Sequence, residues 1–150
     1  VFPIIFDDQN RILLAHRTDR DMWNLPGGRV ESHESPWQAV VREVKEEIDV
    51  AVTVLRLVSV HIRMEENHLS FAFECRIISG EIQTSPEADQ VKYFALSAIP
   101  LNTALGHVLH IQDAFSPSLG PILSIREGKS SIELQKDGTL EYEVKKILEA

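Results

Sequence analysis

Carboxylates gather on one short stretch of the chain, residues 27–50. If residues 36–48 form a helix, Glu43, Glu46 and Glu47 stand at positions i, i+3 and i+4, so their side chains share one side of the helix. Like charges at this spacing cost an isolated helix roughly 0.2–0.5 kcal/mol per pair. Because this crowding is unfavourable by itself, it predicts that a positive group sits on the carboxylates. A divalent cation is the natural candidate.

The start of this helix is marked by local sequence. Ser35 suits the N-cap, Pro36 suits the first helical position, and Gln38 suits the capping box. Apolar residues then recur at helical spacing and predict a buried stripe formed by Trp37, Val40, Val41, Val44 and Ile48. The stripe and the carboxylates therefore occupy different faces. The pattern stops at Asp49, where a glycine would close the helix most comfortably.

Strands are expected on both sides of the helix. Two apolar segments, residues 1–6 and 11–17, flank the polar DDQN run and predict a β-hairpin. Residues 52–62 and 69–77 predict two strands joined by the polar MEENH segment, and residues 91–95 predict a short third strand. The carboxylate helix thus lies between β segments, which indicates an α/β protein.

The C-terminal part predicts a different organisation. Residues 103–115 predict a helix, and residues 116–121 predict a connector because they contain two prolines and a glycine. The remaining tail predicts a hairpin followed by a short helix, formed by residues 122–125, 132–134 and 140–148. We expect one domain over 1–150, with a core of about residues 1–115. The tail has enough apolar residues to pack on this core or on a second subunit, so a monomer and a homodimer both remain open.

Composition limits the classes of partner. Acidic residues outnumber basic residues by 23 to 15, and the resulting net charge of -8 disfavours nucleic acid polymers. A small phosphate compound remains open, because a metal on the carboxylates would reverse the local charge. The single cysteine, Cys75, excludes an internal disulfide and predicts a buried, inert thiol in a cytoplasmic setting. No apolar stretch approaches the roughly 20 residues of a membrane span, so no membrane partner is expected.

The stretch resembles the Nudix box of the Nudix hydrolases, whose pattern is G-x5-E-x7-R-E-U-x-E-E-x-G-U with U a bulky aliphatic residue. The matching positions are Gly28, Glu34, Arg42, Glu43, Val44, Glu46, Glu47 and Val50. Asp49 stands in place of the last glycine. The pattern specifies many positions at fixed spacing, so the resemblance is specific. It extends more loosely over residues 1–115 and leaves the tail unexplained.

The resemblance implies the Nudix fold, a mixed β-sheet sandwiched between α-helices. It also implies hydrolysis of a nucleoside diphosphate linked to another moiety, with Mg²⁺ or Mn²⁺ as cofactor. By position, the implied metal ligands are the Gly28 carbonyl, Glu43, Glu46, Glu47 and one acidic residue beyond the box, where Glu87 is preferred to Asp89. The implied catalytic group consists of Arg42, Glu43 and Glu46, with Glu43 as a further ligand or general base, and Glu34 supports them.

Substrate recognition is less defined by the sequence. Arg17 and Arg29 flank the glycine turn and are candidates for phosphate contacts, and Trp23 is a candidate for stacking. His107 and His110 are expected to be ordinary surface histidines. Known substrate motifs of the family are missing downstream of the box, which favours a nucleoside di- or triphosphate by elimination. The alternatives are ADP-ribose or another nucleotide sugar, and a Nudix-fold module that binds nucleotides without cleaving them.

Overall fold

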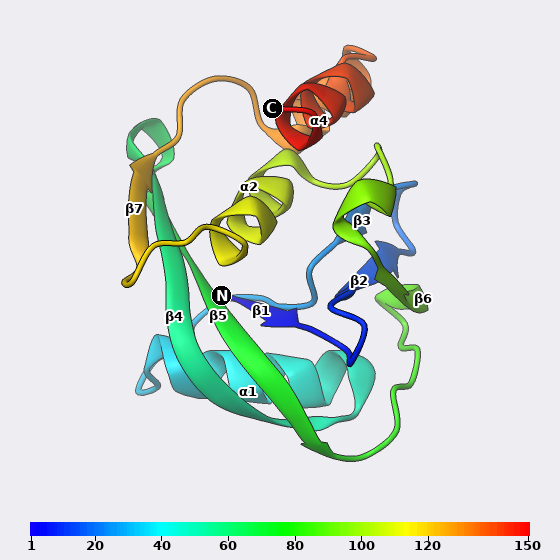
Figure 1. Ribbon diagram of the computed structural model, residues 1–150, viewed down its shortest axis with the longest axis vertical. Helices are drawn as coiled ribbons and strands as arrows, with labels where there is room; N and C mark the ends of the chain where they lie inside the picture. The colour runs from blue at the N-terminus through cyan, green and yellow to red at the C-terminus, as the bar shows by residue number, and fades with distance from the viewer.

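Two β-sheets form the centre of the computed structural model, which describes residues 1–150 (Figure 1). The first sheet has the order β1-β5-β4-β7, with β1 at Phe2–Ile5, β5 at His68–Ser79, β4 at Ala51–Arg63 and β7 at Ile122–Ile125. The second has the order β3-β2-β6, with β3 at Trp23–Asn24, β2 at Ile12–Arg17 and β6 at Ala88–Phe94. The first sheet is mixed, because β4 and β5 are antiparallel, whereas β1 pairs with β5 in parallel and β7 pairs with β4 in parallel.

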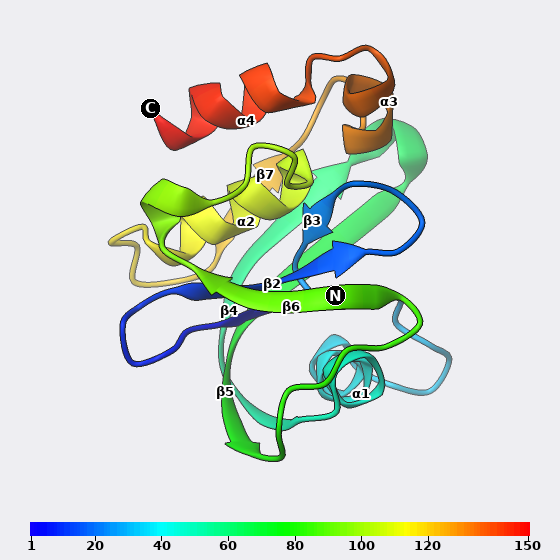
Figure 2. The same ribbon diagram turned by 90° about the vertical axis from the view of Figure 1, so that its right-hand side faces the viewer.

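Helices cover both sides of these strands (Figure 2). One side carries α1 (Pro36–Ile48), and the other carries α2 (Leu105–Ala114) with α4 (Leu140–Leu148) packed on it. A short helix, α3 (Ser131–Lys136), precedes α4. Two single-turn 3-10 helices occupy residues 64–66 and 96–98. The predicted α/β fold, with mixed β structure between helices, is confirmed.

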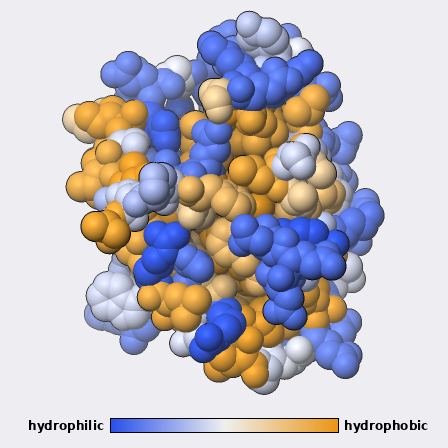
Figure 3. All heavy atoms as spheres, in the orientation of Figure 1, coloured by the Kyte–Doolittle hydropathy of each residue, from blue (hydrophilic) through white to orange (hydrophobic).

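The hydrophobic core is divided by the strands, because successive residues of a strand point to opposite faces. Ile4 lies in the core beneath α2, whereas its neighbour Ile5 lies in the core beneath α1. Leu14 and Leu13 divide in the same way. On the face drawn in Figure 3, apolar side chains run through the middle and hydrophilic side chains gather around them. The core that contains Ile5 and Leu13 therefore holds α1, which carries the carboxylates, against the strands.

Helix α1 begins at the predicted residue. The Gln38 backbone N–H donates to Ser35 Oγ, and the Ser35 N–H donates to Gln38 Oε1 at 2.8 Å, which completes the capping box. Val40 and Val44 are buried as expected. The prediction that Trp37 and Val41 join the core is wrong, because their exposed fractions are 59% and 36%. Helical spacing gives the direction of a side chain, but it does not show whether another element covers that turn.

Helix α1 ends on Asp49 in the left-handed conformation, with φ 59° and ψ 29°. Asp49→Gly removes backbone strain of about 1 kcal/mol. The same change removes the exposed contact of Asp49 with Lys45 Nζ at 2.6 Å, which contributes about 0–1 kcal/mol. We therefore expect the free energy of unfolding in urea to change by less than about 1 kcal/mol, with little change in turnover. Asp49→Ala, the control, keeps the strain and loses the contact, so it should be less stable. A rise in turnover by orders of magnitude for Asp49→Gly would contradict this view of the substitution.

The predicted hairpin between residues 1–6 and 11–17 is wrong. Strand β1 pairs with β5, whereas β2 pairs with β3 and β6, and only an isolated bridge between Phe6 and Ile12 joins the two segments. Both segments are apolar on both faces, so each is buried between the two cores. A polar turn allows a hairpin, but the long-range pairing depends on which neighbours cover these faces. The β4–β5 hairpin, whose turn is the MEENH segment, is confirmed.

The predicted hairpin in the tail is also wrong. Strand β7 pairs in parallel with β4, and residues 132–134 lie in α3. The Ser130–Glu133 capping box that starts α3 is visible in the sequence but belongs to a helix of only 6 residues. Helix α4 packs on α2, and Gln112 Nε2 donates to the Ile147 carbonyl at 2.6 Å. The tail therefore packs on its own chain. None of the helices has the length and apolar character that crossing a membrane requires.

Candidate active site

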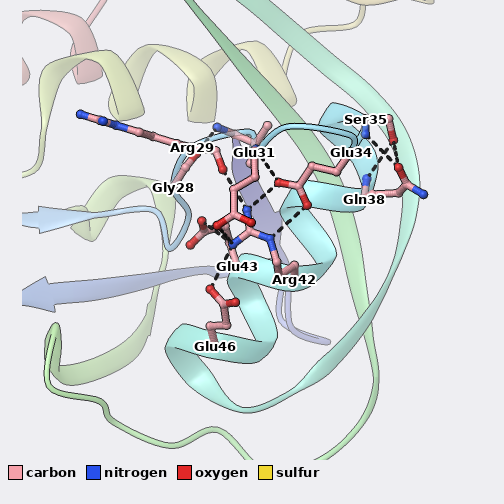
Figure 4. A network of polar contacts seen from close by, with 10 residues as sticks. Gly28, Arg29, Glu31, Glu34, Ser35, Gln38, Arg42, Glu43 and Glu46 are labelled. Atoms are coloured by element: carbon pink, nitrogen blue, oxygen red, sulfur yellow. Dashed lines mark hydrogen bonds and ion pairs between the residues drawn. The ribbon is translucent and has the colours of Figure 1, made fainter.

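Arg42 is the centre of a charged network between α1 and the loop before it (Figure 4). Its guanidinium donates to both carboxylate oxygens of Glu34, at 2.6 and 3.0 Å. It also donates to Glu43 Oε1 at 2.9 Å, to Glu46 Oε2 at 3.1 Å and to the Arg29 carbonyl at 2.9 Å. The hydrogen bonds from Arg42 hold the pKa of Glu34 down at about 2 and raise the pKa of Arg42. Arg42 therefore fixes the loop and two carboxylates relative to one another.

Glu47 is the most deeply placed carboxylate of this helix face. Its Oε2 accepts a hydrogen bond from the Gly27 N–H at 2.8 Å. Burial, together with the neighbouring charges of Glu87 and Glu43, raises the pKa of Glu47 to about 7 against the opposing effect of the Gly27 hydrogen bond. No cationic side chain forms a hydrogen bond or ion pair with it. This carboxylate is therefore costly to ionise until a cation compensates it.

These side chains surround a cavity of about 280 Å³, here called the acidic cavity. Its lining consists of Glu31, Arg42, Glu43, Glu46, Glu47, Ser85, Pro86 and Glu87. It thus holds five carboxylates and one guanidinium that is already paired with several of them. Mg²⁺ and similar hard cations take oxygen ligands, commonly carboxylates together with water. The donor set of the acidic cavity fits such a cation.

Gly28 lies directly against Glu43, one of the residues that line this cavity. A Cβ at Gly28 would lie 2.4 Å from Glu43 Oε1, so any larger residue must displace the carboxylate. The Gly28 carbonyl accepts from the Val1 nitrogen at 2.7 Å. A carbonyl oxygen has two lone pairs, so a second one remains for a ligand. The glycine turn therefore brings the backbone and the Glu43 carboxylate into close approach.

We expect Gly28→Ala to raise the Mg²⁺ concentration needed for half-maximal activity by about 10–100-fold, a typical effect of disturbing the surroundings of metal ligands. The displaced Glu43 carboxylate is the reason. Activity is measured as a function of Mg²⁺ concentration, and the thermal midpoint is measured alongside. Gly120→Ala is the matched control, because a Cβ there meets no atom within 4 Å. An unchanged Mg²⁺ requirement for Gly28→Ala would show that the close approach has no functional role.

The two candidate acidic residues beyond the box are placed differently. Glu87 lines the acidic cavity, and its charge acts on Glu47. Asp89 instead contacts His16 Nδ1 at 2.8 Å, while the other ring nitrogen of His16 contacts Asp21 at 2.9 Å. Asp89 therefore belongs to a contact between β6 and β2 and does not line the acidic cavity.

The three candidates for substrate contacts are not brought together. Arg17 makes a double contact with Asp19, at 2.6 and 2.7 Å. The Arg29 side chain extends away from the carboxylates (Figure 4). Trp23 is only 9% exposed and packs against the rings of His16 and Phe94. None of the three residues lines the acidic cavity.

A second cavity, of about 380 Å³, lies between α2, β4, β5 and the tail and was not predicted. His107 and His110 line it. Their prediction as surface residues is wrong, because His110 is buried and His107 is half-buried. The Leu25 N–H donates to His107 Nδ1 at 2.9 Å, and burial lowers the pKa of His107 to about 3. His107 is therefore neutral, with its proton on Nε2. Little in the sequence indicates this burial, because a partly polar helix resembles a surface helix until strands β1, β4 and β5 are known to pack against it.

His110 is held between two hydroxyl groups. Ser59 Oγ lies 2.6 Å from its Nδ1, and Ser70 Oγ lies 2.9 Å from its Nε2. Burial lowers the pKa of His110 to about 2, and the nearby rings of His61 and His107 contribute. Since one serine can donate while the other accepts, the neutral ring satisfies both partners. The two serines come from β4 and β5, so only the folded sheet brings them together.

Comparison with known proteins agrees with this geometry. The family model described as the NUDIX domain matches residues 1–112. An ADP-ribose pyrophosphatase of Methanocaldococcus jannaschii is 34% identical over 116 residues, which cover 73% of this chain and 68% of that protein. A MutT-like protein of Streptomyces ambofaciens is 29% identical over 132 residues, covering 88% of this chain and 85% of that protein.

The fold of this chain is similar to a solved structure over most of the length of both chains. The crystal structure of an ADP-ribose pyrophosphatase from Streptococcus suis 89-1591 matches with a TM-score of 0.67 and 26% identity, covering 81% of this chain and 95% of that chain. The family match includes the glycine turn and the helix that carry the acidic cavity. The family model, the relatives and the solved structure therefore agree, and this chain belongs to the Nudix hydrolase family.

Proposed function

We propose that this protein hydrolyses a pyrophosphate bond in a nucleoside diphosphate-linked compound, using Mg²⁺ or Mn²⁺ at the acidic cavity. Nudix hydrolases generally use a divalent metal. The observation that carries the proposal is the set of five carboxylates around one cavity with a single cationic side chain, Arg42. The raised pKa of Glu47 supports it, because a buried carboxylate surrounded by like charges requires a cation.

The roles of the residues follow from their positions. Glu46, Glu47 and Glu87 would hold the metal, together with the Gly28 carbonyl. When bound, the ion neutralises the pyrophosphate, polarises the attacked phosphorus and acidifies a water molecule. Glu43 Oε1 is engaged by Arg42, whereas its Oε2 has no protein partner. We therefore assign Glu43 Oε2 as the general base for a water in the cavity, with a role of Glu43 as a further metal ligand as the alternative.

Arg42 would act through the carboxylates. Its bonds to Glu34 and the Arg29 carbonyl keep the guanidinium in place, so the charges of Glu43 and Glu46 stay at fixed positions. Preorganised charges need little rearrangement when the reaction begins. The same bonds limit the repulsion between the two carboxylates before a metal arrives.

The substrate remains a choice between two groups of nucleotides. The sequence favours a nucleoside di- or triphosphate by elimination. ADP-ribose or another nucleotide sugar is the second candidate, and the relatives named ADP-ribose pyrophosphatase favour it. Both groups contain a pyrophosphate bond, so the chemistry at the acidic cavity is the same.

A nucleotide panel tests the proposed function. Nucleoside di- and triphosphates, ADP-ribose and UDP-glucose are incubated with the protein and Mg²⁺, and release of phosphate, pyrophosphate and nucleoside monophosphate is measured. We expect release from at least one compound, lost when EDTA removes the metal. Tight binding of a nucleotide without release from any of them would instead favour the non-catalytic binding module. Release that persists in EDTA would contradict the role of the metal.

A further inference from the structure

One wall of the second cavity comes from the tail. Six tail residues line it, namely Arg126, Glu127, Lys129, Ser130, Ser131 and Ile132. All of them lie beyond residues 1–112, which the family model matches. In Figure 1 the tail runs in orange and red from β7 past α2 to α4. The family match therefore does not account for this wall.

The lining of the second cavity contains more cationic than anionic side chains, although the net charge of the protein is -8. Four cationic side chains line it, Arg17, Arg63, Arg126 and Lys129, against two carboxylates, Glu66 and Glu127. Three of the cations are paired, Arg17 with Asp19 at 2.6 Å, Arg63 with Glu66 at 2.8 Å, and Lys129 with Asp137. For Arg126 the nearest carboxylate, Asp113, is 4.0 Å away. Arg126 is therefore the least compensated cation of the cavity.

Arg126 also lacks acceptors for its N–H groups. Its Nη2 lies 3.1 Å from His61 Nε2, but the same ring nitrogen lies 2.6 Å from Asp113 Oδ2. One nitrogen cannot donate to the carboxylate and accept from the guanidinium, and the shorter contact places the proton on His61 Nε2. Arg126 Nε is buried without any partner. Burial lowers the pKa of Arg126, and only the distant Asp113 opposes this effect.

The neighbouring histidines do not offer a metal site that would explain this arrangement. Ligand atoms of His61, His110 and Asp113 lie within 4.8 Å of one another. However, the two rings are stacked, with centroids 3.7 Å apart and an angle of 4° between their planes. The lone pair of a ring nitrogen lies in the plane of its ring, so two parallel rings cannot both aim at one ion. The two serines already occupy both nitrogens of His110. An anion facing Arg126 is the simpler occupant.

The second cavity lies beside the acidic cavity. Arg17 lines the second cavity, and its charge acts on Glu47 in the acidic cavity. Phe2 lines the second cavity and also lies against Gly27, where an added Cβ would be 2.9 Å from its ring. Gly27 in turn donates to Glu47. A ligand whose pyrophosphate lies at the acidic cavity can therefore extend another group into the second cavity.

We propose that the second cavity binds the part of the substrate remote from the cleaved bond, and that Arg126 selects an anionic group on it, a phosphate or a carboxylate. This inference rests on the proposed function and narrows its substrate class. The substrate is then a nucleoside diphosphate-linked compound with an additional negative charge. Arg126 is a specificity-determining residue, since a charge-assisted hydrogen bond to an anion would satisfy its free N–H groups.

Two matched pairs of ligands test the inference on the full chain. ADP-ribose is compared with its 2′-phosphate, and UDP-glucose with UDP-glucuronate, by titration calorimetry with Ca²⁺ in place of Mg²⁺. We expect the more anionic member of at least one pair to bind about tenfold more tightly or better. Arg126→Gln should reduce this ratio to within about twofold, while Arg126→Lys, which keeps the charge, should retain part of it.

Arg76→Gln is the matched control. It makes the same change of side chain and charge, but Arg76 is exposed on β5 and lines neither the second cavity nor the acidic cavity. Its ligand ratio should therefore equal that of the wild type. Equal affinity within both pairs for the wild type, no binding of any of the four ligands, or an equal loss in Arg76→Gln would overturn the inference.

The inference and the proposed function fail separately. Mg²⁺-dependent hydrolysis of some nucleotide, with no preference within either pair, would leave the function standing and remove the role of Arg126. A preference that depends on Arg126, with no hydrolysis of any nucleotide, would support the role of Arg126 and remove the proposed function. The wild-type comparison needs no variant, so poor folding of Arg126→Gln would not prevent a decision.

Discussion

Glu47→Gln is expected to slow Mg²⁺-dependent hydrolysis by about 10²–10³-fold. A bound metal contributes several kcal/mol of charge stabilisation in the transition state, and each 1.36 kcal/mol corresponds to a factor of ten in rate. Glu47 is the carboxylate that burial and like charges make most dependent on a cation. The amide keeps the shape and can still accept the hydrogen bond from Gly27, but it has no negative charge. Initial rates at saturating nucleotide and varied Mg²⁺ measure the effect.

The same variant should show an opposite effect on stability. Without metal, removing a poorly compensated charge is expected to raise the thermal midpoint of Glu47→Gln above that of the wild type at pH 8. With Mg²⁺ at about 100 times its dissociation constant, the wild type should gain about 2.7 kcal/mol, and the variant should gain less. Glu65→Gln, at an exposed residue of the β4–β5 turn, is the control. Wild-type rates in both Glu47→Gln and Glu46→Gln would refute the metal assignment.

Acid is expected to unfold the metal-free protein as the pH falls below about 6.5, through histidines that are buried and neutral. Burial lowers the pKa values of His61, His107 and His110, the latter two to about 3 and about 2. Below the unfolded pKa of about 6.5, the unfolded chain binds protons that the folded protein does not. Stability is therefore present above this pH and is lost as the pH falls. Each such histidine contributes up to about 1.4 kcal/mol per pH unit.

One histidine acts in the opposite direction. Hydrogen bonds to Asp21 and Asp89 raise the pKa of His16, so its contribution is present below the unfolded pKa and is lost as the pH rises through the folded value. Glu47 acts in the same direction as His16 in the metal-free protein, because its folded pKa of about 7 lies above its usual value of 4.5 and the folded protein therefore binds a proton first. Three histidines against these two groups still give a net loss in acid. Glu34, whose folded pKa is about 2, adds to the loss only below its usual value of 4.5.

Urea unfolding at intervals between pH 4.5 and 7.5 measures this dependence. His110→Gln can keep hydrogen bonds to Ser59 and Ser70 without binding a proton, so its slope should be smaller by up to about 1.4 kcal/mol per pH unit. His33→Gln changes an exposed histidine and should leave the slope unchanged. A stability that is constant or rises from pH 6.5 to 5 would contradict the buried neutral state of these rings.

Features that depend on a few neighbouring residues could be predicted from the sequence. The capping box of α1, its buried residues Val40 and Val44, and the β4–β5 hairpin are all local patterns. The carboxylate face of α1 is local for the same reason, because i, i+3 and i+4 spacing places side chains together on any helix. The roles of these carboxylates remain predictions, but their convergence required only a helix and a glycine turn.

Features that depend on neighbours far along the chain could not be predicted in this way. The pairing of β1 with β5, the parallel addition of β7 to β4, and the burial of His107 and His110 each involve segments separated by tens of residues. Trp37 shows the opposite case. Its helical position predicted burial, but no distant segment covers it and its exposed fraction is 59%.

The sequence by itself therefore determined the family, the helix and its acidic face, because the spacing of residues along one helix sets these. Only the tertiary structure decided that the tail closes a second cavity beside that face, lined by more cationic than anionic side chains, and that Arg126 faces it with little compensation. The physical reason is that no local pattern in the sequence marks the position of a cavity. Its shape and charge arise where β4, β5, α2 and the tail meet, and each of these segments alone is compatible with other neighbours.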